Sequence, residues 1–97
     1  MPNSPLQIED IFSSKLRVKI LKILWQLCEV NVSEIARRLR VNHKTTIEHL
    51  KLLEAEGIIQ HKTFGRIRLY RFNEASPKTK AIQRFLEAWE LAEKGQK

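Results

Sequence analysis

Polar side chains suited to molecular recognition are concentrated in two stretches of the sequence, 42–51 and 62–68. The first stretch combines amide, imidazole, hydroxyl, carboxylate and ammonium groups, whereas the second is basic and free of acidic residues. Groups of these kinds bond to base edges and to phosphate oxygens, so the pattern is typical of nucleic-acid recognition. The candidate contact residues are Asn42, His43, Lys44, Thr45, Glu48, His49, Lys51, Lys62, Arg66 and Arg68.

The sequence shows no comparable grouping for catalysis or metal binding. No nucleophile is paired with a general base, and Glu48-His49 lacks the second histidine of a zinc-protease helix. His43 should point to a different face of the same helix than His49, and Cys28 is the only cysteine. We therefore expect no enzymatic activity, no metal and no cofactor. We expect Cys28 to be a small buried side chain on an apolar helix.

The composition indicates a single small domain with a polyanionic partner. The chain has 97 residues, with 18 lysines and arginines against 11 aspartates and glutamates, which gives a net charge of +7. A basic protein of this size favours nucleic acid. No apolar run is long enough to cross a bilayer, and Met1–Pro5 lacks a secretory pattern. We therefore expect a cytoplasmic protein without membrane association, and residues 1–7 are predicted to be a flexible arm.

The elements that must position the polar residues are predicted from periodicity and capping residues. Apolar spacing and β-branched runs predict helices at 6–12, 14–28, 34–40, 43–56 and 77–94, strands at 58–64 and 66–72, and an extended stretch at 30–32. Ser33, Asn42 and Ser76 are the predicted N-caps. Gly57 and Gly65 stand where a helix end and a tight hairpin need positive φ. The predicted fold class is α+β and mostly helical.

The predicted helix at 14–28 is apolar on two sides. Val18, Leu21 and Trp25 lie off the face that carries the other apolar residues. Because a domain this small can hardly cover both sides, we expect the second side to be a subunit interface. The helix at 77–94 has a similar stripe, so we predict a homodimer built from residues 6–28 and 77–94. The predicted interface residues are Val18, Leu21, Trp25, Ile82, Phe85, Leu86 and Trp89.

The run from Ser33 to Ile59 resembles the helix-turn-helix core of arsenic-repressor-like (ArsR-type) winged-helix regulators. The family pattern of a hydroxyl-rich recognition helix, then His-Leu-Lys, a leucine and a glycine, is matched by His49-Leu50-Lys51, Leu53 and Gly57. The wing sequence from Gly65 to Arg71 is also similar. The likeness covers about residues 8–75.

The resemblance implies a winged helix-turn-helix with a DNA-binding domain at 8–76, a two-stranded wing and a C-terminal dimerisation helix at 77–97. It also implies a dimer built from the first and last helices. The chain departs from metal-sensing members of the family, because Glu29–Ser33 holds no Cys-x-Cys pair and residues 77–94 contain no histidine. We therefore expect no sensing of metal or arsenite.

These patterns together predict a homodimeric transcriptional regulator, expected to be a repressor, that binds double-stranded DNA sequence-specifically. The helix at 43–56 would lie in the major groove and the hairpin at 58–72 on the flanking groove or backbone. Two-fold symmetry would place the half-sites about 34 Å apart, or a multiple of that. No effector site is visible in the sequence, so control by a small molecule, a partner protein or protein abundance stays open.

Two other functions are compatible with the same patterns. One is a winged helix used as a protein–protein interaction module within a transcription or repair complex, which would tolerate Arg66→Glu and Arg68→Glu. The other is a binder of RNA or single strands, which would need exposed aromatic side chains for stacking. Phe64 and Tyr70 are the only candidates for that role.

Overall fold

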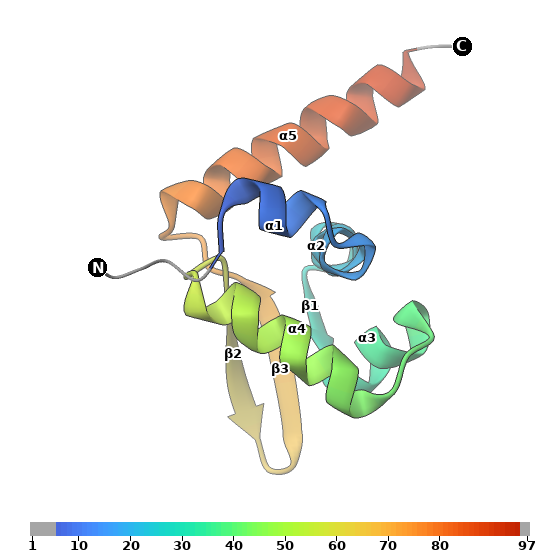
Figure 1. The fold of residues 1–97 in the computed structure, drawn as a ribbon, viewed down its shortest axis with the longest axis vertical. Coiled ribbons are helices and arrows are strands. Elements are labelled where there is room, and N and C mark those ends of the chain that lie inside the picture. The colour runs from blue at the N-terminus through green and yellow to red at the C-terminus, as the bar shows by residue number, and fades with distance from the viewer. Residues whose placement is uncertain (1–5, 96–97) are drawn as a thin grey trace.

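Helices lead into a β-hairpin and a last long helix in the computed structural model, which describes residues 6–95 (Figure 1). The elements in chain order are α1 (Ile8–Phe12), α2 (Lys15–Leu27), β1 (Glu29–Asn31), α3 (Val32–Leu39), α4 (His43–Ala55), β2 (Ile59–Phe64), β3 (Ile67–Phe72) and α5 (Pro77–Lys94). The predicted α+β, mostly helical class is confirmed. Within residues 6–95, none of the helices has both the length and the apolar character needed to cross a membrane.

Short-range hydrogen bonds set where two of the helices begin. The side chain of Asn42 accepts a bond from the Thr45 N–H at 2.8 Å, and α4 follows it. Ser76 accepts from the Thr79 N–H at 3.3 Å, and Pro77 occupies the first turn of α5. Proline suits this position because its missing N–H would have no partner within the helix. Both predicted caps are therefore confirmed.

The start of α3 differs from the prediction. Ser33 was the expected cap, but the helix begins at Val32, and Asn31 Oδ1 accepts from the Glu34 N–H at 2.8 Å. Asparagine and serine cap helices about equally well. Asn31 is the cap because it ends β1 with an extended backbone (φ −86°, ψ 163°), which is the conformation that an N-cap needs.

The strands form one antiparallel sheet in the order β1-β3-β2. β1 pairs with β3 through Val30↔Tyr70, so the sheet has three strands, and the two-stranded wing is its long hairpin. Gly65 has φ +60° in the hairpin turn, and Gly57 has φ +77° after α4, as predicted for both glycines. The hairpin register places Phe64 opposite Ile67.

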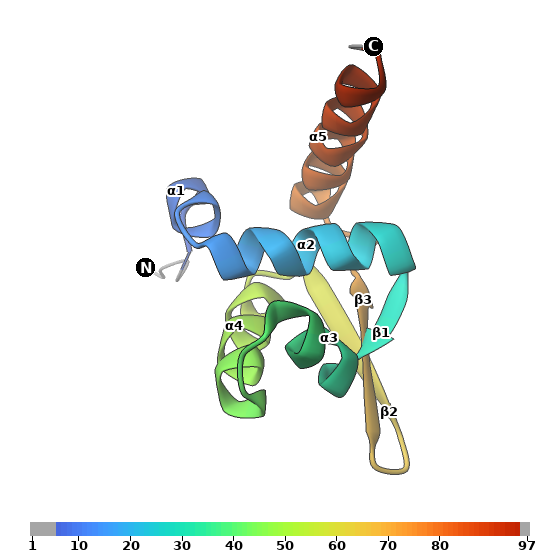
Figure 2. The same cartoon turned by 90° about the vertical axis from the view of Figure 1, so that its right-hand side faces the viewer.

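α2 is the central helix of the protein. It lies between α5 on one side and the α3–α4 pair on the other, while the wing projects away from the body (Figure 2). The core joins α2 to the helix-turn-helix and the sheet. Its fully buried side chains include Ile20, Leu24, Ile35, Leu50, Leu53, Ile58 and Tyr70.

Two predictions about exposure are wrong. Leu6, expected in a flexible arm at 1–7, is buried, and its N–H donates to Glu56 Oε2 at 3.1 Å. Gln7 also lies in an ordered position as the N-cap of α1. Residues 1–5 of that predicted arm, and 96–97 of the predicted C-terminal segment, lie outside the described residues. Cys28, expected to be buried, is exposed because it follows the last turn of α2 with φ 70° and ψ −57°.

Candidate nucleic-acid interface

The connection between α3 and α4 is only three residues long, Arg40 to Asn42. Arg40 takes the left-handed conformation (φ 61°, ψ 40°), and its N–H donates to Ala36 O at 2.9 Å. This bond closes α3, and the Asn42 cap then opens α4. Because both ends of the turn are held by bonds to the backbone, α4 is presented at a defined angle to α3.

The solvent face of α4 carries most of the predicted contact residues. Thr46, Leu50 and Leu53 are fully buried on its inner face, and the Thr46 hydroxyl donates to Asn42 O at 3.0 Å. Helical periodicity turns the residues between them outward. Asn42, His43, Lys44, Glu48 and Lys51 are exposed, and Thr45 is half-buried.

His49 is less exposed than most of the other predicted contact residues on α4. It is half-buried, and its Nδ1 atom is enclosed without a hydrogen-bond partner, as is Nε of Arg17 among the described residues. Arg17 extends from α2, where its Nη1 group donates to Asp10 O at 2.8 Å. One edge of the His49 imidazole is therefore shielded from solvent, and its role in DNA contact stays a prediction.

Burial lowers the pKa of the His49 imidazole below its ordinary value of 6.5, and the charge of Arg17 lowers this pKa further, while Glu48 opposes both effects. The unfolded chain therefore takes up a proton at His49 at a higher pH than the folded chain does. It follows that stability present above about pH 6.5 is lost as the pH falls towards the pKa of the folded state.

Replacing His49 with glutamine should therefore reduce the loss of stability on acidification. We expect the urea midpoint of the His49→Gln variant to fall less than that of the unaltered protein between about pH 7.5 and pH 5.5. His43→Gln, at an exposed imidazole on the same helix, is the matched control. An equal fall in the His49→Gln and unaltered proteins would show that His49 does not titrate in this way.

The wing brings further cations next to α4. Lys62 and Arg66 are exposed and Arg68 is half-buried, with its Nη1 group 3.5 Å from the Tyr70 hydroxyl oxygen. A groove of about 270 Å³ is lined by Ser33, His43, Ile47, Arg66 and Arg68 among others, so it joins the first turns of α3 and α4 to the tip of the wing. Ser33 was not among the predicted contact residues, because its hydroxyl was expected to cap α3.

A contact between α4 and β2 holds the wing against the helix-turn-helix. His61 Nδ1 lies 2.8 Å from Glu54 Oε2, and the His61 ring lies 5.1 Å from the ring of Tyr70. Tyr70 is fully buried. The wing therefore contacts the C-terminal end of α4 through His61 and Glu54, and Tyr70 anchors it in the core. These contacts make α4 and the wing parts of one surface.

The arginines of α3 are partly neutralised within their own helix. Arg37 and Arg38 both bond to the Glu34 carboxylate, and Arg37 with Arg38 lowers the pKa of that carboxyl. Arg40 lies outside this cluster in the helix-turn-helix turn. Because two arginines face one carboxylate, the C-terminal end of α3 keeps a positive charge. This end of α3 leads into the turn before α4.

A second surface, on the side of α2 away from the helix-turn-helix, is apolar. We call Phe12, Val18, Trp25, Phe85 and Trp89 the aromatic face. Phe85 lies 5.7 Å from Phe12 and 6.1 Å from Trp89, measured between ring centroids. Phe85 and Trp89 are 48% and 58% exposed. The residues of this face surround a hollow of about 470 Å³.

The other predicted interface residues differ in exposure. Leu21 is 2% exposed and belongs to the core, so its predicted interface role is wrong. Its side chain packs in the hydrophobic core, and α2 as a whole lies between α5 and the α3–α4 pair (Figure 2). Ile82 and Leu86 are half-buried and pack against the core, from which they continue the apolar stripe of α5 outward.

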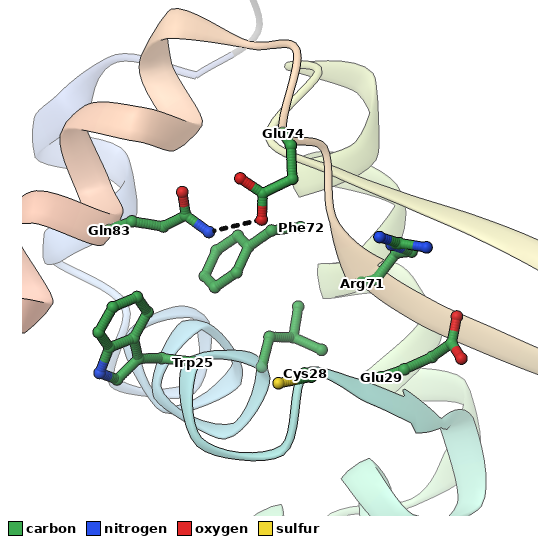
Figure 3. Close-up of a pocket in the computed structure, with 8 residues that line it drawn as sticks. Trp25, Cys28, Glu29, Arg71, Phe72, Glu74 and Gln83 are labelled. Atoms are coloured by element: carbon green, nitrogen blue, oxygen red, sulfur yellow. Dashed lines mark hydrogen bonds between the residues drawn. The ribbon is translucent and has the colours of Figure 1, made fainter.

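A further pocket of about 450 Å³ lies between the end of α2, the end of β3 and α5 (Figure 3). Trp25, Cys28 and Phe72 form its apolar part. At its rim Gln83 donates to Glu74 at 3.0 Å. Within residues 6–95, this pocket included, no three His, Cys, Asp or Glu side chains gather in a way that could hold a metal ion.

A helix-turn-helix whose second helix leads straight into a β-hairpin of the same unit defines the winged helix-turn-helix class. The family model described as bacterial regulatory protein, arsR family, matches residues 14–61, from the cap of α2 into β2. The match covers 48 of the 97 residues, so the chain is similar to the arsR family of bacterial regulatory proteins across its helix-turn-helix. A comparison with curated protein sequences gives no significant match.

Solved structures confirm the fold. HlyU from Vibrio cholerae is 23% identical, with a TM-score of 0.70 over 81% of this chain and 83% of its own. The homodimeric winged helix-turn-helix domain Mb0332 from Mycobacterium bovis is 21% identical, with a TM-score of 0.68 over 82% and 71%. The antimony-specific transcriptional repressor AntR is 17% identical, with a TM-score of 0.68 over 90% and 76%.

Proposed function

We propose that this protein binds a pseudo-palindromic DNA site as a homodimer and represses transcription from it. The outward residues of α4, chiefly Lys44, Thr45, Glu48 and Lys51, lie in the major groove. The wing cations lie on the flanking backbone or minor groove. The observation that carries this proposal is the shared groove that joins the start of α4 to Arg66 and Arg68 of the wing.

Charge and hydrogen-bonding capacity support this arrangement. No acidic residue occurs from Ile58 to Phe72. On α4, Glu48 is an exposed acidic residue between Lys44 and Lys51, and a carboxylate there can accept a bond from a cytosine amino group. Phosphate contacts would then come from the lysines and arginines, and base readout from Thr45 and Glu48.

The dimer is supported by the aromatic face. Within α5, only Thr79 is buried among the described side chains, although the helix runs from Pro77 to Lys94. A long amphipathic helix that buries so little against its own chain needs a second apolar surface. A second copy supplies one, and the similar domain Mb0332 is described as homodimeric. Repression follows if the dimer covers a promoter, and AntR is described as a repressor.

Selection of bound duplexes from a random pool, followed by titration at several salt concentrations, tests the proposal. We expect a two-fold symmetric site with half-sites about 34 Å apart or a multiple of that. If about six phosphates are neutralised, a plot of log affinity against log salt has a slope near −5.

A flat salt response would contradict the proposal and favour a protein–protein interaction module. Preference for single strands would contradict it as well. The structure offers little for such binding, because Tyr70 is fully buried and Phe64 is the remaining stacking candidate on the wing.

A further inference from the structure

The tip of the wing carries two large apolar side chains that the fold does not bury. Phe64 is 56% exposed and Ile67 is 52% exposed. They are register partners at the last pair before the Gly65-Arg66 turn. Directly opposed residues of an antiparallel pair point to the same face of the sheet. The two side chains therefore form one apolar edge at the tip.

This edge has no packing role in the core. β2 is buried at Ile59 and exposed at every residue after it, and β3 is buried at Tyr70 and Phe72, near its far end. The hairpin extends beyond the body of the protein (Figures 1 and 2). Phenylalanine and isoleucine at such a place leave apolar surface in water, which is unfavourable unless another molecule covers it.

The charges around the edge indicate which molecule covers it. The Lys62 Nζ atom lies 5.5 Å from the centroid of the Phe64 ring, and Arg66 and Arg68 flank Ile67 in the sequence. An apolar edge with cations around it is complementary to a partner that has anionic groups on its surface and apolar groups beneath them. Duplex DNA is such a partner, because its phosphates border grooves through which the stacked bases can be reached.

We propose that Phe64 and Ile67 act as a wedge that enters the minor groove beside the half-site and partly unstacks one base step. This inference rests on the proposed function, since it takes the wing to lie on DNA. The cations contact the two phosphate backbones that border the groove, and the apolar side chains of Phe64 and Ile67 enter the groove between these backbones. Opening a step bends the duplex, and flexible pyrimidine–purine steps such as TA are the easiest to open. The wedge therefore selects a TA or CA step at the flank of the site.

The test uses the selected duplex with 2-aminopurine placed at successive flanking positions, because this base fluoresces more strongly when it is unstacked. We expect the unaltered protein to raise the fluorescence at one step in each flank. The Phe64→Ala, Ile67→Ala double variant should lose that rise and bind about tenfold more weakly. Its salt slope should stay unchanged because no cation is removed. Thr63→Ala is the matched control, since Thr63 is exposed on the same strand and points to the other face of the sheet.

The outcomes separate the wedge from the function on which it rests. Tight, salt-dependent binding without a rise at any flanking position would overturn the wedge and leave DNA binding intact. A rise that persists in the double variant would also overturn it. A double variant that binds DNA normally but changes its oligomeric mass in light scattering would show that the edge contacts protein instead. Failure of the unaltered protein to bind any duplex would overturn the proposed function together with the wedge.

Discussion

Replacing both Phe85 and Trp89 with alanine should convert the protein from a dimer to a monomer at micromolar concentration. The two side chains belong to the aromatic face and are about half exposed in one protomer. Burial of the exposed half of four such side chains, two from each protomer, contributes about 3–6 kcal/mol to a dimer. Their loss should weaken dimerisation by roughly 10²- to 10⁴-fold.

The same variant should lose affinity for the full site but not for a half-site. Two linked recognition helices bind two half-sites with an advantage of roughly 10²- to 10⁴-fold over one. A monomer forfeits this advantage, although its own α4 and wing are unchanged. We therefore expect the full-site and half-site affinities of the variant to become similar.

Light scattering and titration with full-site and half-site duplexes measure both effects. Glu87→Ala is the control, because Glu87 is exposed on α5 and lies on the side away from Phe85 and Trp89. A circular dichroism spectrum establishes that the double variant is folded. A variant that stays dimeric, or an unaltered protein that is monomeric at the same concentration, would disprove the role of the aromatic face.

Reversing the charge of both wing arginines, by Arg66→Glu and Arg68→Glu, should abolish most DNA affinity. Both residues line the groove that joins the wing to the start of α4. The change removes two phosphate contacts and adds two repulsive ones. At constant salt we expect a loss on the order of a hundredfold, and the salt slope should become shallower by about two.

A double charge reversal on α5, Arg84→Glu and Lys94→Glu, produces the same change in net charge away from the wing. Both residues are exposed on α5, where Lys94 lies opposite to Phe85 and Arg84 lies to one side of it. If long-range attraction by the basic protein explained binding, the two double variants would lose affinity equally. A wing variant with unchanged affinity would support a protein–protein module instead.

The order and ends of most elements were predictable because they depend on neighbours in the sequence. Asn42 and Ser76 cap helices through bonds to an N–H three residues ahead. Gly57 and Gly65 supply positive φ where a helix ends and a hairpin turns. The basic character of the wing is also evident from the sequence, because no acidic residue occurs from Ile58 to Phe72. These signals act over a few residues, so the sequence alone was enough to indicate a winged helix and its basic surface.

The burial of particular side chains was decided by contacts between distant segments. Leu21 was expected at an interface, but α2 lies between α5 and the helix-turn-helix, so the protomer itself buries this residue. His49 has a polar side chain typical of a groove contact, yet the position of Arg17 and α2 beside α4 half-buries it. Leu6 is buried although residues 1–7 carry no strong structural signal. Periodicity gives the direction of a side chain around its own helix, whereas only the tertiary structure determines what lies in that direction.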